Sequence, residues 1–326
     1  MNARRLLLPL GIAVGAGAAL RAACHRRGLL PQARLGCPVI SVGNLSVGGS
    51  SKTPLVAWIA ERLLAASLPV AILSRGYGGS FRGDCLIVND GERVLAGAEQ
   101  AGDEPVMLSR ELPSAVVAVG PRRDIVGQAV LARFGRRVLL LDDGFQHLRL
   151  ARDLDVLCLG KGDADDWPLP AGRLREFARA SARADVKLRV LEADDTSHGA
   201  DVFARRRPAG FVDLRGNPQQ APLRPALLSG IARPERFRAD VRSLGVEVVS
   251  HTRFPDHHRF QADDVVAAAR SARAAGADAL VTTAKDAVRF PDLELPLRML
   301  VMKITLELLD ESAFLERLLA VARKTA

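Results

Sequence analysis

Aromatic residues are scarce in this chain of 326 residues, at 4% of the total, with one tyrosine, Tyr77, and two tryptophans, Trp58 and Trp167. Proteins that bind single-stranded nucleic acid without sequence preference stack the bases on aromatic side chains. So few rings cannot build a stacking surface of that kind. We therefore expect no nucleic acid among the partners of this protein.

Cysteine is equally sparse, with four residues, Cys24, Cys37, Cys85 and Cys158. No two of them have the CxxC spacing of a structural zinc site, which excludes that class of metal centre. Cys37 and Cys158 lie in apolar, strand-like runs and are expected to be buried thiols of the core. This usage is typical of a protein in a reducing cytoplasm.

Acidic residues are outnumbered, with 37 Asp and Glu against 46 Lys and Arg, which leaves a net charge of +9. A basic balance suits an anionic partner, such as nucleic acid, an anionic membrane surface or a phosphorylated substrate. A solvated, arginine-rich surface without such a partner explains the charge equally well. The charge alone does not choose among these possibilities.

The N-terminal segment has an uncharged run over residues 6–20, with Arg4 and Arg5 before it and Arg21, Arg26 and Arg27 after it. A signal peptide and an ordinary core helix both fit this outline. A helix over this run would be about 22 Å long at ~1.5 Å per residue, shorter than a hydrocarbon core of ~30 Å. We favour a helix that is sunk into one leaflet, with arginines at both ends meeting lipid phosphates.

Apolar runs alternate with helical patterns after residue 38. Strands are expected at 39–42, 69–74, 85–90, 115–120, 137–143 and 154–160, with helices from Pro54, from Asp103 and over 122–134. Strands that are apolar throughout and alternate with helices indicate a parallel sheet covered on both faces. The fold class is therefore α/β.

A polar stretch over residues 192–222 is predicted to be a linker to a second, smaller α/β unit. Its expected strands are 226–232, 246–251, 279–285 and 297–304, and a last helix covers 309–323. The predicted domains are an N-terminal membrane-associated helix (1–35), a larger α/β domain (36–215) and a smaller α/β domain with the C-terminal helix (216–326).

A glycine-containing loop between the first strand and the first helix resembles a phosphate-binding loop, whose strict pattern is GxxxxGK[ST]. Backbone N–H groups of such a loop bind phosphate oxygens, its Lys reaches the β- and γ-phosphates, and its hydroxyl holds Mg²⁺. Both pattern glycines are serine here, so an ordinary βα loop remains the alternative. The window consists of Ser46, Val47, Gly48, Gly49, Ser50, Ser51, Lys52 and Thr53.

A second element supports the nucleotide site. The apolar run before Asp142 and Asp143 is a buried strand that ends in two carboxylates, which is how a phosphate-loop enzyme presents acids to Mg²⁺. A solvated turn is the alternative for this pair alone. Both motifs follow strands of one sheet, where α/β proteins bind ligands. Together they predict an ATP and Mg²⁺ site.

Further polar motifs lie at strand ends and in loops. They are SRGYGG (74–79), GDEP (102–105), LPAGRLRE (169–176) and FPDHHRF (254–260). With VGNLSVGGSSKTP, DDGFQHLRLARDLDVL, GIARPERF and TTAKDAVRF, their order resembles the tetraacyldisaccharide 4′-kinases, the lipid A 4′-kinases of Gram-negative bacteria. The resemblance covers nearly the whole chain and implies a phosphate-loop α/β core, a smaller α/β domain and an N-terminal membrane helix.

The resemblance also implies the reaction and its residues. The γ-phosphoryl group of ATP would move to the 4′-hydroxyl of a tetraacyldisaccharide 1-phosphate at the cytoplasmic face of the inner membrane, where residues 1–27 hold the protein. Lys52 and Thr53 would handle the ATP phosphates and Mg²⁺, with Asp142, Asp143 and Glu176 on the metal side. Asp103 would be the base, with His257 as its partner. Substrate-side residues would be Arg75, Tyr77, Arg123, Gln146, His147 and Arg175.

The chain departs from the family pattern at three places. Ser51 stands where the family has glycine, Phe177 follows Glu176 where proline is usual, and residues 186–195 do not match the usual apolar strand. The backbone at Ser51 is expected to be strained. Two other functions remain open: a phosphate-loop ATPase that acts as a switch or chaperone, and a degenerate family member that binds lipid without turnover.

Overall fold

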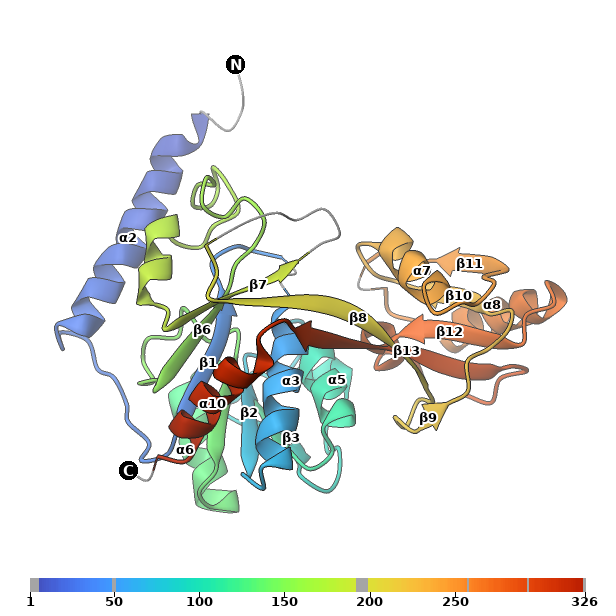
Figure 1. The fold of residues 1–326 in the computed structure, drawn as a ribbon, viewed down its shortest axis with the longest axis horizontal. Coiled ribbons are helices and arrows are strands. Elements are labelled where there is room, and N and C mark those ends of the chain that lie inside the picture. Colours follow the sequence, from blue (N-terminus) through green and yellow to red (C-terminus); the bar gives the residue numbers. More distant parts are fainter. Residues whose placement is uncertain (1–5, 49–50, 192–198, 257, 292, 325–326) are drawn as a thin grey trace.

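One continuous sheet runs through the molecule (Figure 1). The computed structural model describes residues 6–48, 51–191, 199–256, 258–291 and 293–324. In these residues the sheet has 13 strands in the order β11-β10-β12-β13-β8-β7-β6-β1-β5-β2-β4-β3, with β9 (Pro218–Gln219) paired to β8. The predicted α/β class is confirmed.

The larger half of the sheet is mostly parallel. Its strands β6 (Leu154–Cys158), β1 (Val39–Asn44), β5 (Val138–Asp142), β2 (Val70–Ser74) and β4 (Val116–Val119) pair in parallel and are buried throughout. The edge strand β3 (Leu86–Asp90) is antiparallel to β4, so the expectation of a wholly parallel sheet is wrong there. The apolar strands are buried because helices cover both faces.

One face of this half is covered by α3 (Lys52–Ala65), α5 (Asp103–Glu111) and α10 (Glu311–Ala322), beside the short α4 (Ala98–Ala101). Trp58 of α3 stacks on Phe314 of α10 at 5.9 Å, which brings the C-terminal helix into the core of the larger half. The opposite face is covered by α6 (Arg123–Phe134). The predicted helices at these places are confirmed within a few residues.

Two long strands join the halves. β8 (Val202–Val212) and β13 (Arg298–Leu308) pair antiparallel over most of their length, and β7 (Val186–Leu191) connects β8 to β6. The linker prediction is therefore wrong for 202–212, and 192–198 lie outside the described residues. The polar sequence misled it because exposed and half-buried positions alternate over residues 205–210 of β8, where the exposed Arg207 pairs with Glu307 of β13 at 2.7 Å.

The smaller half contains β10 (Ala226–Ser229), β11 (Ser250–Arg253) and β12 (Ala279–Thr283), which pair in parallel with each other and with β13. Its helices are α7 (Pro234–Arg242), α8 (Ala262–Ala274) and the short α9 (Ala284–Ala287). The strand predicted at 246–251 lies at 250–253. The division into domains at residue 215 stays a prediction.

The antiparallel β8–β13 pair reverses the strand direction between the halves. The carboxyl ends of the two sets of parallel strands consequently point toward each other, and α5 of the larger half meets α9 of the smaller half. Arg110 Nη1 of α5 donates to the carbonyl oxygen of Ala287 at 3.1 Å. The polar loops of both halves are thereby brought to one place.

The N-terminal helix α2 (Leu8–Arg26) lies along the outside of the larger half (Figure 1). Gly11, Gly15 and Ala22 are its buried positions, whereas Leu10 is 55% and Leu20 67% exposed. The core-helix interpretation is therefore wrong. By length and composition, α2 is the one helix in the described part of the chain that could cross a membrane.

Glycine lets α2 approach the loop that precedes the 3₁₀ helix η1 (Ala178–Arg183). A Cβ atom on Gly11 would lie 2.7 Å from the carbonyl oxygen of Pro168, and one on Gly15 would lie 2.7 Å from the Phe177 ring. Phe177, the departure from the family's proline, thus fills the space that Gly15 leaves. These glycines weaken the helix by themselves, but they permit its contact with the body of the protein.

We expect Gly11→Ala and Gly17→Ala to have opposite effects. Alanine is the better helix former by about 1 kcal/mol, and nothing lies within 4 Å of a Cβ on Gly17, so Gly17→Ala should stabilise α2. Gly11→Ala should loosen it, because the backbone of Pro168 must shift at a cost of about 1–3 kcal/mol. The rate of trypsin cleavage after Arg21, Arg26 and Arg27 measures this. Equal rates in both variants would contradict the contact.

Candidate active site

The carboxyl ends of three adjacent parallel strands provide the polar centre of the site. β1 ends at Asn44, β2 at Ser74 and β5 at Asp142, and α3 begins at Lys52. Lys52 Nζ donates to Asn44 Oδ1 at 2.9 Å and lies 3.3 Å from Asp143 Oδ1. The lysine of the predicted phosphate loop and the carboxylates predicted to bind metal are therefore direct neighbours.

The turn into α3 is strained at Ser51. Its backbone has φ 59° and ψ 26°, in the left-handed region that glycine adopts freely and other residues adopt at a cost of about 1–3 kcal/mol. Gly48 also has a positive φ, of 111°. The expectation of strain at Ser51 is confirmed. Gly49 and Ser50 lie outside the described residues, while Ser46 and Thr53 are buried and Val47 is 41% exposed.

Asp142 is a buried carboxylate close to Lys52 and to the carboxylates of Asp143 and Glu104. Its side chain is 1% exposed, Oδ2 accepts a hydrogen bond from Ser74 Oγ at 3.3 Å, and Oδ1 has no hydrogen-bond partner in the described residues. Burial raises the pKa of Asp142 to about 7, with further contributions from the carboxylates of Glu104 and Asp143. A buried carboxylate with one orphaned oxygen fits an oxygen-preferring divalent cation such as Mg²⁺.

Asp143 is held by two cations. Arg175 Nη1 lies 2.7 Å from its Oδ2, and Lys52 lies near its Oδ1. Burial opposes ionisation, but Lys52 and then Arg175 outweigh it and lower the pKa of this carboxyl group. Arg175 Nη1 also donates to Gln146 Oε1 at 3.2 Å, and Gln146 Nε2 donates to the Asn44 carbonyl oxygen at 2.9 Å. Arg175 and Gln146 therefore form a chain of hydrogen bonds that connects Asp143 to Asn44, at the end of β1 before the phosphate loop.

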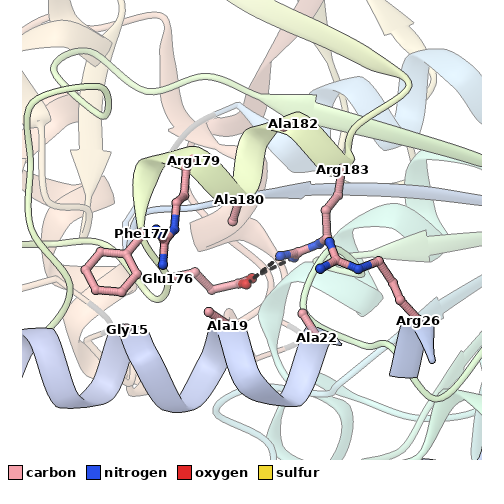
Figure 2. Close-up of a pocket in the computed structure, with 10 residues that line it drawn as sticks. All are labelled: Gly15, Ala19, Ala22, Arg26, Glu176, Phe177, Arg179, Ala180, Ala182 and Arg183. Atoms are coloured by element: carbon pink, nitrogen blue, oxygen red, sulfur yellow. Dashed lines mark hydrogen bonds and ion pairs between the residues drawn. The ribbon is translucent and has the colours of Figure 1, made fainter. Parts of the chain in front are cut away.

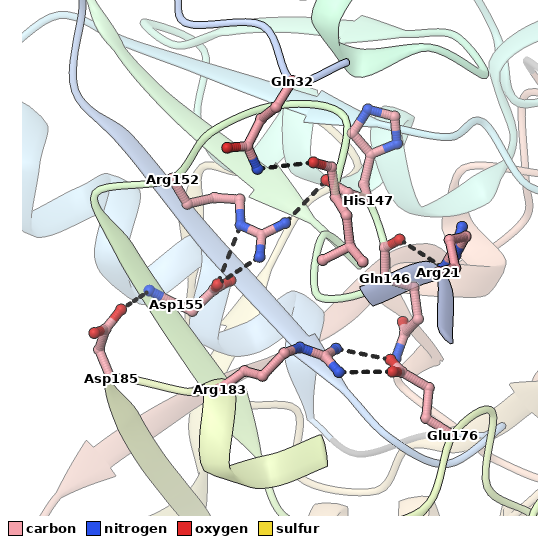
Figure 3. Close-up of polar contacts among 10 residues, drawn as sticks. Arg21, Gln32, Gln146, His147, Arg152, Asp155, Glu176, Arg183 and Asp185 are labelled. Atoms are coloured by element: carbon pink, nitrogen blue, oxygen red, sulfur yellow. Dashed lines mark hydrogen bonds and ion pairs between the residues drawn. The ribbon is translucent and has the colours of Figure 1, made fainter. Parts of the chain in front are cut away.

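Glu176 is separated from these carboxylates by its own ion pair. Both of its oxygens accept from Arg183, at 2.8 and 2.9 Å, and its side chain is 3% exposed (Figure 3). Arg183 is also stacked over the Phe145 ring at 4.6 Å. The described residues contain no group of three His, Cys, Asp or Glu side chains that could hold a metal ion. Of the three carboxylates predicted to bind metal, Asp142 and Asp143 lie together, whereas Glu176 is paired with Arg183 instead.

The predicted substrate-side residues fall into two classes. Arg75 and Tyr77 are exposed, the latter by 81%, whereas Arg123 is 6% exposed. Burial and the neighbouring Arg123 lower the pKa of His147 to about 4, and its Nε2 lies 3.6 Å from Asp124 Oδ1. His147 is therefore a neutral, nearly buried side chain. Arg75 and Tyr77 are the ones open to a ligand.

Asp103 begins α5, and glycines place it. A Cβ on Gly102, which has φ 88°, would lie 2.3 Å from the Tyr77 carbonyl oxygen, and one on Gly79 would lie 2.3 Å from that of Gln100. The SRGYGG and GDEP loops therefore fit together backbone to backbone. Asp103 Oδ2 lies 2.9 Å from Arg289 Nε of the smaller half.

The FPDHHRF motif contains two adjacent histidines, His257 and His258. His257 lies outside the described residues. His258 is stacked on Phe254 at 4.4 Å, and its Nε2 lies 2.9 Å from Asp264 Oδ2 at the start of α8. This hydrogen bond and the aromatic cluster explain the position of His258 in the smaller half.

Three residues near the site were not predicted. Asn44 is the hydrogen-bond acceptor of Lys52, Glu104 raises the pKa of Asp142, and Arg289 pairs with Asp103. Asn44 and Glu104 lie in the motifs VGNLSVGGSSKTP and GDEP, and Arg289 in TTAKDAVRF. The motifs marked these positions, but only the tertiary structure shows which side chains meet.

A cavity of about 310 Å³ lies between α2 and η1, beside the buried Glu176–Arg183 pair (Figure 2). Small residues of α2, Gly15, Ala19 and Ala22, form one wall, and Phe177 closes one end. Arg21 of α2 donates to the Gln146 carbonyl oxygen at 3.1 Å (Figure 3). This hydrogen bond connects the surface helix to the loop that carries Asp143.

Comparisons with known proteins agree with this geometry. A family model described as tetraacyldisaccharide-1-P 4′-kinase matches residues 3–323. The chain belongs to this family. A tetraacyldisaccharide 4′-kinase of Anaeromyxobacter sp. (strain Fw109-5) is 46% identical over 87% of this chain and 82% of its own. One of Pelobacter propionicus is 39% identical over 89% and 84%. The resemblance seen in the sequence and the expectation of a kinase are confirmed.

A solved structure extends the agreement to the fold. It is described as an "apo" form of LpxK from Aquifex aeolicus in complex with ATP, and it is 30% identical to this chain. It superposes with a TM-score of 0.84 and covers 98% of this chain and 99% of its own. The arrangement of both halves is therefore that of the family.

We expect Ser51→Gly to raise the free energy of unfolding by on the order of 0.5–1 kcal/mol, because relief of strain exceeds the extra entropy of an unfolded glycine. Ser67→Gly is the matched control, because Ser67 lies outside the site and also has a left-handed backbone, with φ 61°. Both variants should gain similar stability in denaturant unfolding. Glycine adopts the same left-handed turn and keeps the backbone N–H, so ATP affinity should change by less than about threefold. Weaker ATP binding in Ser51→Gly alone would show that the serine hydroxyl contacts the nucleotide.

Proposed function

We propose that this protein transfers the γ-phosphoryl group of ATP to the 4′-hydroxyl of a tetraacyldisaccharide 1-phosphate, as the names of its relatives imply. The observation that carries the proposal is the cluster of Lys52, Asn44, Asp143 and the buried Asp142 at the start of α3. A cation at a helix N-terminus, with carboxylates at the adjacent strand end, is the arrangement that handles nucleotide phosphates in phosphate-loop enzymes.

The nucleotide side of the proposed reaction depends on Lys52. Its ammonium group would move from Asn44 and Asp143 onto the β- and γ-phosphates, where negative charge develops during transfer. Mg²⁺ held by Asp142, Asp143 and the Thr53 hydroxyl would neutralise phosphate charge. Lys52 and then Arg175 lower the pKa of Asp143 against the effect of burial, and an ionised carboxylate suits that role.

The acceptor side depends on Asp103. Its carboxylate would accept the proton of the 4′-hydroxyl as the new P–O bond forms, and the bond between the γ-phosphorus and the bridging oxygen would break to release ADP. His257 is the proposed partner of Asp103. The support for this choice is the resemblance of the FPDHHRF motif to the family.

Replacement of Lys52 tests the function. Lys52→Ala should lower turnover by about 10²–10³-fold, since it removes a charge that faces the transition state. The measurement is transfer of labelled γ-phosphate to the disaccharide lipid, with Lys324→Ala as an exposed lysine control. ATP hydrolysis without transfer to lipid would favour the switch or chaperone hypothesis, and lipid binding without any turnover would favour a degenerate member.

We further propose that α2 holds the protein on the cytoplasmic face of the inner membrane. Its exposed residues Leu10, Ile12, Val14 and Leu20 supply an apolar surface, and Arg21, Arg26 and Arg27 follow it. A surface of this kind binds anionic lipid through burial of its apolar side chains and through attraction between the arginines and the lipid phosphates. The membrane, and the glycolipid acceptor in it, would then lie on the side of the molecule where Arg21 of α2 contacts the Gln146 loop.

Vesicle binding tests the membrane proposal. The double variant Leu10→Gln/Leu20→Gln should bind anionic vesicles at least tenfold more weakly in a sedimentation assay. Insertion of two leucine side chains into the bilayer contributes about 3–6 kcal/mol to binding. Leu223→Gln is the control, since Leu223 is 80% exposed and lies in the smaller half. Salt should release the intact protein only partly. Complete release by salt alone would reduce the contact to a basic patch.

A further inference from the structure

Arg289 is a buried cation at the contact between the two halves. It follows α9 in the motif TTAKDAVRF, and its side chain is only 7% exposed. A buried guanidinium group is costly unless its charge and its donors are satisfied. The identity of its partners therefore shows what the cation is for.

The guanidinium group connects three segments. Nε lies 2.9 Å from Asp103 Oδ2 of the larger half. Nη1 donates to the carbonyl oxygen of His258 at 3.1 Å and to that of Gly230 at 3.4 Å. Neither Nε nor Nη2 makes a hydrogen bond with the described residues. The contact with Asp103 is thus an ion pair at short range without an aligned hydrogen bond.

The orientation of Arg289 is set from within the smaller half. Asp286 is fully buried, and its Oδ1 lies 3.5 Å from Arg289 Nη1. Its Oδ2 accepts hydrogen bonds from the Gly230 amide at 3.1 Å and from Thr283 Oγ1 at 2.8 Å. Asp286 is therefore fixed by two strand ends, and the cation that it holds is aimed at Asp103.

The pair differs from a structural ion pair in the same chain. Arg183 engages both oxygens of Glu176 with aligned hydrogen bonds, which holds that carboxylate in one orientation. Arg289 instead attracts the Asp103 carboxylate by charge, with Nε 2.9 Å from Oδ2. Catalytic hydrogen bonds in ligand-free enzymes are often poorly aligned and tighten when the substrate binds.

We propose that Arg289 is a positioning residue for Asp103, which it aims at the acceptor hydroxyl while its other arm fixes the backbone of the FPDHHRF loop. The inference rests on the proposed role of Asp103 as the base. Through Arg289 the smaller half thereby contributes a side chain to the site, and the reacting geometry depends on contact between the halves. A misplacement of about 1 Å in such a group can lower turnover by about 10²-fold.

The test compares Arg289→Met and Arg289→Lys in the full chain, with Arg110→Met as the matched control. Arg110 also joins α5 to α9, through the Ala287 carbonyl oxygen, but it does not contact Asp103 in the structure. Arg289→Met should lower kcat by about 10²-fold with KM values for ATP and acceptor within about threefold. Arg289→Lys should recover about tenfold of the loss, and Arg110→Met should keep kcat despite a lower Tm.

A double-mutant cycle separates positioning from a purely structural role. In an Asp103→Asn background, Arg289→Met should change kcat by less than about threefold, because both changes disable one unit. An undiminished loss in that background, a loss equalled by Arg110→Met, or a rise in KM as the main effect would overturn the positioning role alone. Full activity of Asp103→Asn by itself would instead overturn the base assignment, and the role of Arg289 with it.

Discussion

The antiparallel pairing of β8 with β13 determines the geometry of the whole molecule. Both strands are 11 residues long, and their ladder makes one sheet out of two sets of parallel strands. Because the ladder reverses the strand direction, the carboxyl ends of the two sets face each other. Parallel α/β sheets carry their ligand sites at that edge. The site is consequently built from the loops of both halves, and its geometry depends on their relative position.

Charge compensation organises the centre of the site. Asp142 and Asp143 repel each other, and the two neighbours are treated differently by their surroundings. Asp143 is ionised by Lys52 and Arg175, whereas burial and the nearby Glu104 raise the pKa of Asp142 to about 7. A divalent cation would restore the balance at Asp142. The same logic explains why Arg289 is tolerated in the interior, since Asp103 and Asp286 flank it.

Some backbone segments approach each other so closely that only glycine fits between them. Gly102 and Gly79 let the loops of Tyr77 and Asp103 lie against each other, and Gly11 and Gly15 let α2 lie against the loop before η1. Ser51 shows the opposite case, because a non-glycine residue holds a left-handed turn at the start of α3. The turn into α3 is therefore formed at a local cost in strain of about 1–3 kcal/mol.

The sequence by itself determined the local and repetitive parts of this protein. Uniformly apolar strands alternate with helices, so the parallel core and the lysine and carboxylates at its strand ends could be predicted, since parallel strands share one edge. Residues 202–212 could not, because a strand with one solvated face has the composition of a linker. Long-range pairing decided the rest. The antiparallel position of β3, the burial of His147 and the contact of Arg289 with Asp103 join residues far apart in the chain. No periodicity encodes such contacts, because they depend on how the packed elements meet.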